Sequence, residues 1–187
     1  MTVLPIRITG EPVLHRPATD VTAFDDELAT LVADMFETME AAPGVGLAGP
    51  QVGVGKRVFV YDWTDEDGVR TRGVAVNPTL WISPLPIGVP DDDEEEGCLS
   101  IPGERFGLKR AERALLRAQD ERGEAYELEA SGWLARILQH EYDHLDGVLY
   151  ADRLDAFGTK GVQKAVKRNR WGVPGNAWMP GVDDLDA

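Results

Sequence analysis

Two histidines four residues apart have the clearest capacity for chemistry in this sequence. His140 and His144 flank Glu141 in the string HEYDH, an H-E-x-x-H pattern. On a helix, positions i and i+4 share a face, so both imidazoles can reach one metal ion while Glu141 handles the proton of a bound water. Trp133 and Ile137 fall on the same face, which indicates a partly buried surface rather than a solvated one. The spacing therefore predicts a metal site.

A catalytic metal site usually has three protein ligands, and the histidine pair leaves one ligand to be found. The nearest downstream carboxylates are those of Asp146, Asp152 and Asp155. The upstream alternative is Cys98, the only cysteine, which follows an acidic run and a glycine. A lone cysteine is often an inert core residue, but this polar context is poor for a core. Because a thiolate is a good metal ligand, Cys98 is a candidate for the third position.

Three motifs in chain order resemble those of the peptide deformylase family. The family patterns G-x-G-x-A-A-x-Q, E-G-C-L-S and H-E-x-D-H match residues 44–51, 96–100 and 140–144. Gly49 stands where the family usually has a second alanine, which predicts a looser local backbone, whereas Gln51 is in place. The resemblance also includes Val3 to Leu14 and Ile101 to Tyr150, so it covers most of the chain up to about residue 155.

The resemblance implies a metal-dependent hydrolase that removes the N-formyl group from the N-formylmethionine of nascent polypeptides and releases formate. The metal ligands that it implies are Cys98, His140 and His144. Glu141 would accept a proton from the attacking water and pass it to the leaving amine. The Gln51 side-chain amide and the Leu99 backbone N–H would donate hydrogen bonds to the oxyanion. The expected cofactor is one divalent metal, Fe²⁺ by resemblance, with Zn²⁺, Ni²⁺ or Co²⁺ as substitutes.

A pocket for the methionine side chain is expected beside the metal. Trp133 and Ile137 precede the histidines on one helical stripe, and Val45 and Gly46 belong to the glycine-rich motif. Apolar groups next to the metal would suit an unbranched side chain. Trp133 and Ile137 are equally well explained as ordinary core residues. Arg136, beside the stripe, either borders the pocket mouth or is solvated.

Three other functions compete with this interpretation. Residues 44–49 also match G-x-G-x-x-G, the dinucleotide fingerprint, which requires a strand before the glycines and a helix after them. The sequence predicts the reverse order. An H-E-x-x-H endopeptidase would need neither Gln51 nor Cys98. A non-catalytic metal-binding scaffold would have no use for Glu141, which is present.

Bulk properties limit the compartment and the partners. The 187 residues suit one domain, and the net charge of −14 argues against a protein that broadly coats nucleic acid or anionic membrane. No apolar run approaches the ~20 residues that span a bilayer, and the N-terminus does not resemble a signal peptide. A single cysteine excludes an intrachain disulfide. We expect a cytoplasmic protein with no membrane or DNA partner.

Apolar periodicity and residue type predict the elements that hold these groups. Helices are expected over Asp25 to Ala42, about Gly132 to Leu145, and Ala156 to Arg168. For the second helix, Ser131 is the expected N-cap and Asp146-Gly147 the expected stop signal. β-Strands are expected over Arg57 to Asp62, Gly73 to Asn77, Ala114 to Gln119 and Ala125 to Glu129. The acidic run from Asp91 to Glu95 is expected to be a solvated loop or turn, because like charges repel. The pattern predicts an α+β fold, mainly antiparallel strands around a central helix carrying HEYDH, with a C-terminal helix.

The C-terminal part of the chain differs in composition from the rest. We expect residues 1–170 to form the catalytic domain and residues 171–187 to form a Gly/Pro/Asp-rich tail that is extended or loosely draped. The segment from Arg153 to Arg170 has six basic residues and one acid, a net charge of +5. Its helix would present a basic face formed by Lys160, Lys164, Lys167 and Arg168. That face is either a plain solvated surface or a contact for ribosomal RNA.

Overall fold

The structure, a computed structural model, describes residues 2–183. The α-helices are α1 (Asp26–Ala41), α2 (Gly132–Leu145) and α3 (Ala156–Asn169). The strands are β1 (Ile6–Arg7), β2 (Gly46–Ala48), β3 (Val58–Thr64), β4 (Arg70–Ile82), β5 (Glu95–Cys98), β6 (Ile101–Gly107), β7 (Arg113–Gln119), β8 (Ala125–Ser131) and β9 (Ala177–Trp178). Short 3-10 turns are η1 (Pro12–His15), η2 (Gly49–Val52), η3 (Asp92–Glu94) and η4 (Tyr150–Arg153).

A five-stranded antiparallel sheet, in the order β2-β3-β4-β7-β8, lies between two helices. Successive side chains of a strand point to opposite faces of the sheet, and β3 has buried apolar residues on both faces. Val58 and Val60 pack with the apolar face of α1, whereas Phe59 and Tyr61 pack with α2 on the opposite face. The sheet is therefore buried on both sides at β3, and α2 is held along its inner face.

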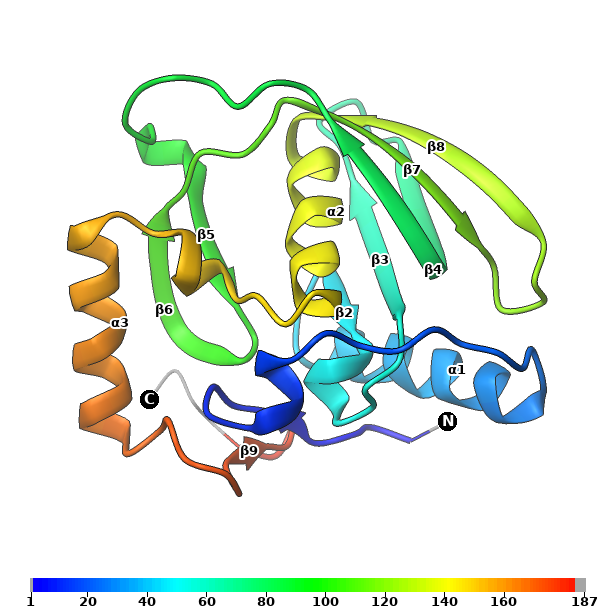
Figure 1. The fold of residues 1–187 in the computed structure, drawn as a ribbon, viewed down its shortest axis with the longest axis horizontal. Helices are drawn as coiled ribbons and strands as arrows, with labels where there is room; N and C mark the ends of the chain where they lie inside the picture. Colours follow the sequence, from blue (N-terminus) through cyan, green and yellow to red (C-terminus); the bar gives the residue numbers. More distant parts are fainter. Residues whose placement is uncertain (1, 184–187) are drawn as a thin grey trace.

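A second, smaller layer covers the other side of α2. Figure 1 shows α2 between the large sheet and the β5–β6 hairpin, with α3 beyond the hairpin. A separate apolar cluster joins this layer and includes Ile101 and Leu108 from the hairpin region, Tyr150 from η4 and Val162 from α3. A Cβ at Gly161 would collide with the Phe106 ring, so this glycine lets α3 lie close against β6. The hairpin, which carries Cys98, is thus fixed from both sides.

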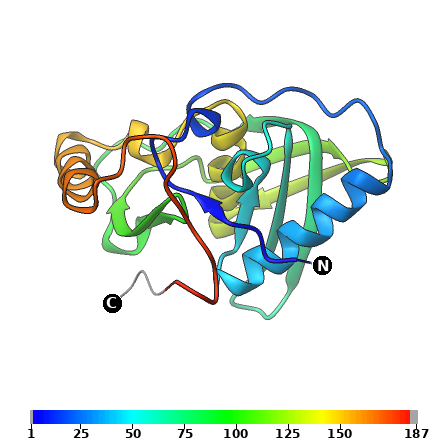
Figure 2. The ribbon, with the colours of Figure 1, turned by 90° about the horizontal axis from the view of Figure 1, so that it is seen from below.

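The two ends of the described chain pair with each other. β1 and β9 pair antiparallel, with Ile6 opposite Trp178. Figure 2 shows the red segment near the C-terminal end of the described chain passing beside the blue N-terminal segment. Ile6 is fully buried in the core under α1. Up to residue 183, the tail consists of bends and turns at residues 172–175 and 180–182, and the two-residue strand β9 between them ties it to the body. Residues 184–187 lie outside the described part of the chain.

The α+β fold with mainly antiparallel strands is confirmed. All three predicted helices are present with boundaries within two residues of those expected. The Asp25 and Asp155 carboxylates cap α1 and α3 by accepting hydrogen bonds from first-turn N–H groups, and Ser131 occupies the predicted N-cap position of α2. The four expected strands are present as β3, β4, β7 and β8. No described helix is long and apolar enough to cross a membrane.

Two local expectations need correction. The acidic run forms the turn η3 with Asp91 and Asp93 exposed, as expected, but it is not solvated throughout: Glu95 begins β5, and Glu94 is only partly exposed because it forms ion pairs with Lys109 and Arg136. The backbone at Gly49 is not loose either. Gly49 is buried, and a Cβ there would lie 2.9 Å from the Val54 carbonyl oxygen, so neighbouring backbone fills the space that an alanine would need.

Candidate metal centre

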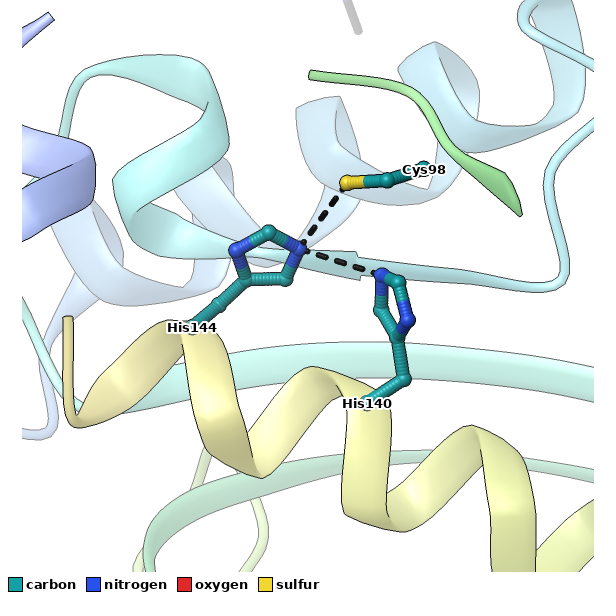
Figure 3. Close-up of side chains that lie close together, drawn as sticks. All are labelled: Cys98, His140 and His144. Carbon is teal, nitrogen blue, oxygen red and sulfur yellow. Dashed lines mark hydrogen bonds between the residues drawn. The ribbon is translucent and has the colours of Figure 1, made fainter. Parts of the chain in front are cut away.

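Three buried side chains bring their ligand atoms together at one point (Figure 3). Cys98 ends β5, and His140 and His144 are one turn apart on α2. His144 Nε2 lies 3.4 Å from Cys98 Sγ and 3.2 Å from His140 Nε2. The ligand atoms all lie within 4.8 Å of one another. One thiolate and two imidazoles form a donor set suited to a divalent ion such as Zn²⁺ or Fe²⁺, so these residues fit a metal.

Glu96 orients the first histidine. The Glu96 carboxylate accepts a hydrogen bond from His140 Nδ1 at 2.6 Å, which leaves the Nε2 lone pair facing Cys98 and His144. Burial alone would raise the pKa of Glu96, but its hydrogen bonds to His140 and Arg110 hold that pKa well below the ordinary value. Glu96 is therefore ionised and fixes the tautomer that a metal ligand requires.

The two histidines have opposite tendencies to hold a proton. Burial opposes charge on His140, yet its contacts with Cys98 and Glu96 raise its pKa well above the ordinary value, so metal binding at its Nε2 must release a proton. Burial and the neighbouring His140 lower the pKa of His144 well below the ordinary value. His144 is consequently neutral, the state in which an imidazole binds a metal.

A buried ion-pair network supports Glu96. Arg110 makes a two-pronged contact with Glu96 at 3.0 and 2.7 Å, and its third nitrogen reaches Asp143 at 2.6 Å. Arg136 adds a contact to Glu96 at 3.3 Å. Such two-pronged guanidinium–carboxylate pairs fix direction as well as charge. The network ties β5, the segment before β7, and α2 into one rigid support for the histidines.

Glu141 lines the same cavity as Cys98 and His140, and it forms no ion pair within residues 2–183. Its Oε2 is buried and has no hydrogen-bond partner among the described residues. Burial raises the pKa of the Glu141 carboxyl to about 7, against the opposing influence of His140. A carboxyl with a pKa near neutrality can take a proton from water and return it to an amine. A Cβ at Gly46 would collide with this carboxylate, so the glycine makes room for Glu141.

Gln51 and Leu99 lie next to the three candidate metal ligands. The Gln51 Oε1 accepts the Ala48 N–H at 2.8 Å, which turns the amide NH₂ toward Cys98, with Nε2 at 3.8 Å from Sγ and 3.5 Å from Ser100 Oγ. Gln51 is almost fully buried, so this orientation is fixed. Leu99 follows Cys98 at the tip of the β5–β6 hairpin. A fixed amide and a backbone N–H are suitable donors for developing negative charge.

Comparison with known proteins identifies the family to which this arrangement belongs. The family model described as polypeptide deformylase matches residues 3–160. Peptide deformylases of Mycolicibacterium smegmatis and Mycolicibacterium paratuberculosis are 52% and 51% identical, each covering 97% of this chain and 96% of the relative. This chain belongs to the polypeptide deformylase family.

Solved deformylase structures agree. The crystal structure of the Thermus thermophilus peptide deformylase has a TM-score of 0.75 and 40% identity, and covers 89% of this chain and 94% of that one. The Synechococcus elongatus peptide deformylase, solved in complex with actinonin, has a TM-score of 0.77 and 36% identity, and covers 91% of each chain. Deformylases are metal-dependent hydrolases that remove the N-formyl group from nascent chains, and this chain shares that activity. The dinucleotide-binding alternative fails, because helix α1 precedes the glycines, β2 lies within them, and the short 3-10 turn η2 follows in place of an α-helix.

A cavity of about 780 Å³ opens onto the deformylase centre and contains the expected pocket residues in its lining. Its wall includes Val45, Gly46, Trp133 and Ile137. Ile137 lines the cavity and is also buried in the core beside the sheet, whereas Trp133 is 40% exposed. Arg136 also lines the cavity but is buried, and it is therefore not a solvated residue.

Sequence reasoning missed three groups at this centre. Glu96 was treated only as part of a motif and an acidic run, although its position before Gly97-Cys98 was a usable signal. Arg110 gave no signal, because its partners Glu96 and Asp143 are 14 and 33 residues away. Trp178, from the tail, lines the cavity and was not singled out.

Proposed function

We propose that this chain hydrolyses the formyl amide of N-formylmethionyl peptides with Cys98, His140 and His144 as the metal ligands and Glu141 as the proton-transfer group. The observation that carries the proposal is the convergence of the three ligand atoms beside a buried carboxyl at the base of an open cavity. Residues 1–170 contain every group assigned a role here.

The mechanism distributes distinct tasks among the residues of the chain. When bound, a divalent metal supplies a water of lowered pKa and polarises the formyl oxygen. Glu141 accepts the water proton as the oxygen attacks the formyl carbon. Glu141 then delivers that proton to the amine as the C–N bond breaks, which releases formate and a free N-terminus. Gln51 Nε2 and the Leu99 N–H donate hydrogen bonds to the formyl oxygen while it carries negative charge.

The substrate side chain is proposed to bind in the cavity wall formed by Val45, Gly46, Trp133 and Ile137. These residues provide apolar surface next to the ligand atoms, which suits the flexible, unbranched methionine side chain. β2 is an edge strand of the large sheet, so its outer side can accept an extended peptide. The peptide would then lie with its formyl end toward Glu141.

Fe²⁺ is the proposed metal, with Zn²⁺, Ni²⁺ and Co²⁺ as functional or partly functional substitutes. The thiolate and the two imidazoles support any of these ions. The assignment of iron depends on the family resemblance, in which ferrous iron is characteristic. A ferrous centre with a thiolate ligand would be sensitive to oxidants.

The proposed setting is the cytoplasm, with a ribosome contact through α3. Lys160, Lys164 and Lys167 are exposed, while Val162 and Ala165 of the same helix are buried against the body. A projecting basic face on a chain of net charge −14 supports contact with phosphate-rich RNA. Arg168, on the same face, is partly occupied by an ion pair with Glu104.

Formate release is the direct test. Purified protein loaded with Fe²⁺ under anaerobic conditions should release formate from formyl-Met-Ala-Ser. An N-acetylated peptide of the same sequence should yield no acetate at a comparable rate, and a longer blocked peptide should show no internal cleavage. Internal cleavage without formate release would instead identify an endopeptidase and contradict the proposal.

A further inference from the structure

The tail contributes a hydrogen bond to the segment that carries the thiol. The Trp178 indole Nε1–H donates to the Leu99 carbonyl oxygen at 2.8 Å, across 79 residues of sequence. Trp178 is held in place by the pairing of β9 with β1. Its ring packs on the core under α1 and also lines the cavity. Trp178 therefore contacts the site although it lies outside residues 3–160, the part matched by the family model.

The peptide that accepts this bond is connected to the thiol at its other end. The Leu99–Ser100 peptide has the Leu99 carbonyl on one side and the Ser100 N–H on the other. That N–H points to Cys98 Sγ at 3.4 Å, and the Ser100 carbonyl accepts the Thr9 N–H at 2.8 Å. A planar peptide moves as one unit, so fixing the carbonyl also fixes the N–H that faces the sulfur.

We propose that Trp178 is a positioning residue of the metal centre, acting through the Leu99–Ser100 peptide. The indole N–H holds this peptide so that the Ser100 N–H faces the Cys98 sulfur and the Leu99 backbone keeps its orientation toward the reacting group. Outer partners of metal ligands orient those ligands and tune their affinity for the metal. The pairing of β1 with β9 thus holds Trp178 in the position from which it contacts the site. The catalytic part of this inference rests on the proposed function; the part concerning metal affinity does not.

Packing alone does not account for the contact. Burying the ring would require only its apolar surface, and a phenyl ring provides much of that surface. The indole N–H contributes a hydrogen bond. Without this donor, the partly buried Leu99 carbonyl is destabilised and the peptide can rotate. Removing the N–H while keeping an aromatic ring therefore separates the two contributions.

The test compares Trp178→Phe, which removes the N–H, with Trp178→Ala, which removes the ring as well. Trp81→Phe is the matched control, because Trp81 is half exposed on β4, away from the site, and stacks with Arg117. A third variant carries β-(3-benzothienyl)alanine at position 178, which keeps the shape of indole without its N–H. This last variant preserves packing even if Trp178→Phe is poorly folded. Zn²⁺ affinity is measured by competition with a chromophoric chelator, and kcat and KM are measured with formyl-Met-Ala-Ser.

We expect Trp178→Phe and the benzothienyl variant each to weaken Zn²⁺ binding and to lower kcat by roughly 10-fold, the low end for an outer partner of a metal ligand, with little change in KM. Trp81→Phe should match the wild type in both. Wild-type Zn²⁺ affinity and kcat in the benzothienyl variant would overturn the proposal and reduce Trp178 to a packing residue. If the wild-type protein released no formate, the proposed function would fail, while the Zn²⁺ comparison would still decide the role of Trp178.

Discussion

Helices α2 and α3 have the same length, 14 residues, but contribute to the molecule in opposite ways. α2 buries ten of its residues, including both candidate histidine ligands and Glu141, whereas α3 buries three and exposes its basic face. In α2, buried polar groups are held by specific partners, so the position of each atom matters. In α3, the buried residues pack against the body, and the exposed basic residues are available for contacts with phosphate. The comparison predicts that α2 variants alter chemistry and α3 variants alter salt-dependent binding.

The largest effect should come from Glu141. Glu141→Gln keeps the shape of the side chain but removes its ability to accept a proton, so turnover should fall by roughly 10²–10⁴. Metal content should stay at the wild-type level, because Glu141 is not a proposed ligand. Steady-state kinetics and elemental analysis of the same sample test both statements. A turnover near that of the wild type would remove Glu141 from the mechanism.

Gln51 lies across the site from α2 and is the proposed uncharged hydrogen-bond donor. Its replacement should have the second-largest effect. Gln51→Ala should lower turnover by roughly 10²–10³, the usual effect of losing one oxyanion donor, without altering metal content. KM and kcat are measured separately. If KM rose while kcat stayed constant, Gln51 would be a substrate-binding contact rather than an oxyanion donor.

Replacing Glu96 should have an intermediate effect, on the affinity for the metal and on the stability at low pH. Glu96→Gln should weaken metal affinity by roughly 10- to 100-fold, because His140 loses the partner that orients it. The matched control is Glu94→Gln, since Glu94 is also ion-paired but contacts Lys109 and Arg136. Chelator competition measures the affinity, and the control should retain the wild-type value.

The same pair of variants predicts a pH dependence. The pKa of Glu96 is depressed in the folded state, so its contribution to the free energy of unfolding is present above its ordinary pKa of 4.5 and is lost as the pH falls below that value. Thermal melts should therefore show a steeper loss of stability below pH 4.5 for the wild type than for Glu96→Gln. Parallel curves for the two proteins would show that the buried network does not contribute to acid sensitivity.

The smallest effect on chemistry should come from α3. Reversing Lys160, Lys164 and Lys167 to Glu should weaken co-sedimentation with ribosomes at low salt and leave hydrolysis of short formyl-peptides unchanged. A control with the same change in charge is the reversal of Lys56, Arg113 and Arg122, which are exposed elsewhere. Equal loss of ribosome binding in both triple variants would mean that net charge, not α3, is responsible.

The difference between the helices also explains what the sequence could predict. The start and end of α2 were predictable because Ser131 and the Asp146-Gly147 pair are local signals that need no partner. Its histidine spacing was predictable for the same reason. The role of Glu96 was not, because an isolated run of carboxylates resembles a solvated surface, and its partners Arg110 and Arg136 are distant in sequence.

The terminal strands were missed for a related reason. β1 and β9 have two residues each, and they are stable only because they pair with each other across the whole chain. The Gly/Pro/Asp composition of the tail predicted an extended or loosely draped segment, whereas residues 171–183 are mostly bends and turns around β9. It contained no information that Trp178 would reach Leu99. Contacts of this kind depend on the complete fold and not on local pattern.

The central claim is that one metal ion, held by Cys98, His140 and His144, is required for deformylation. The most direct measurement titrates metal-free protein with Fe²⁺ under anaerobic conditions while metal content and formate release are followed in the same sample. Formate release should rise in proportion to bound metal and reach its plateau at one ion per chain, and Cys98→Ser should lose metal and rate together. Full formate release by the metal-free protein, or full metal and rate in Cys98→Ser, would contradict the account.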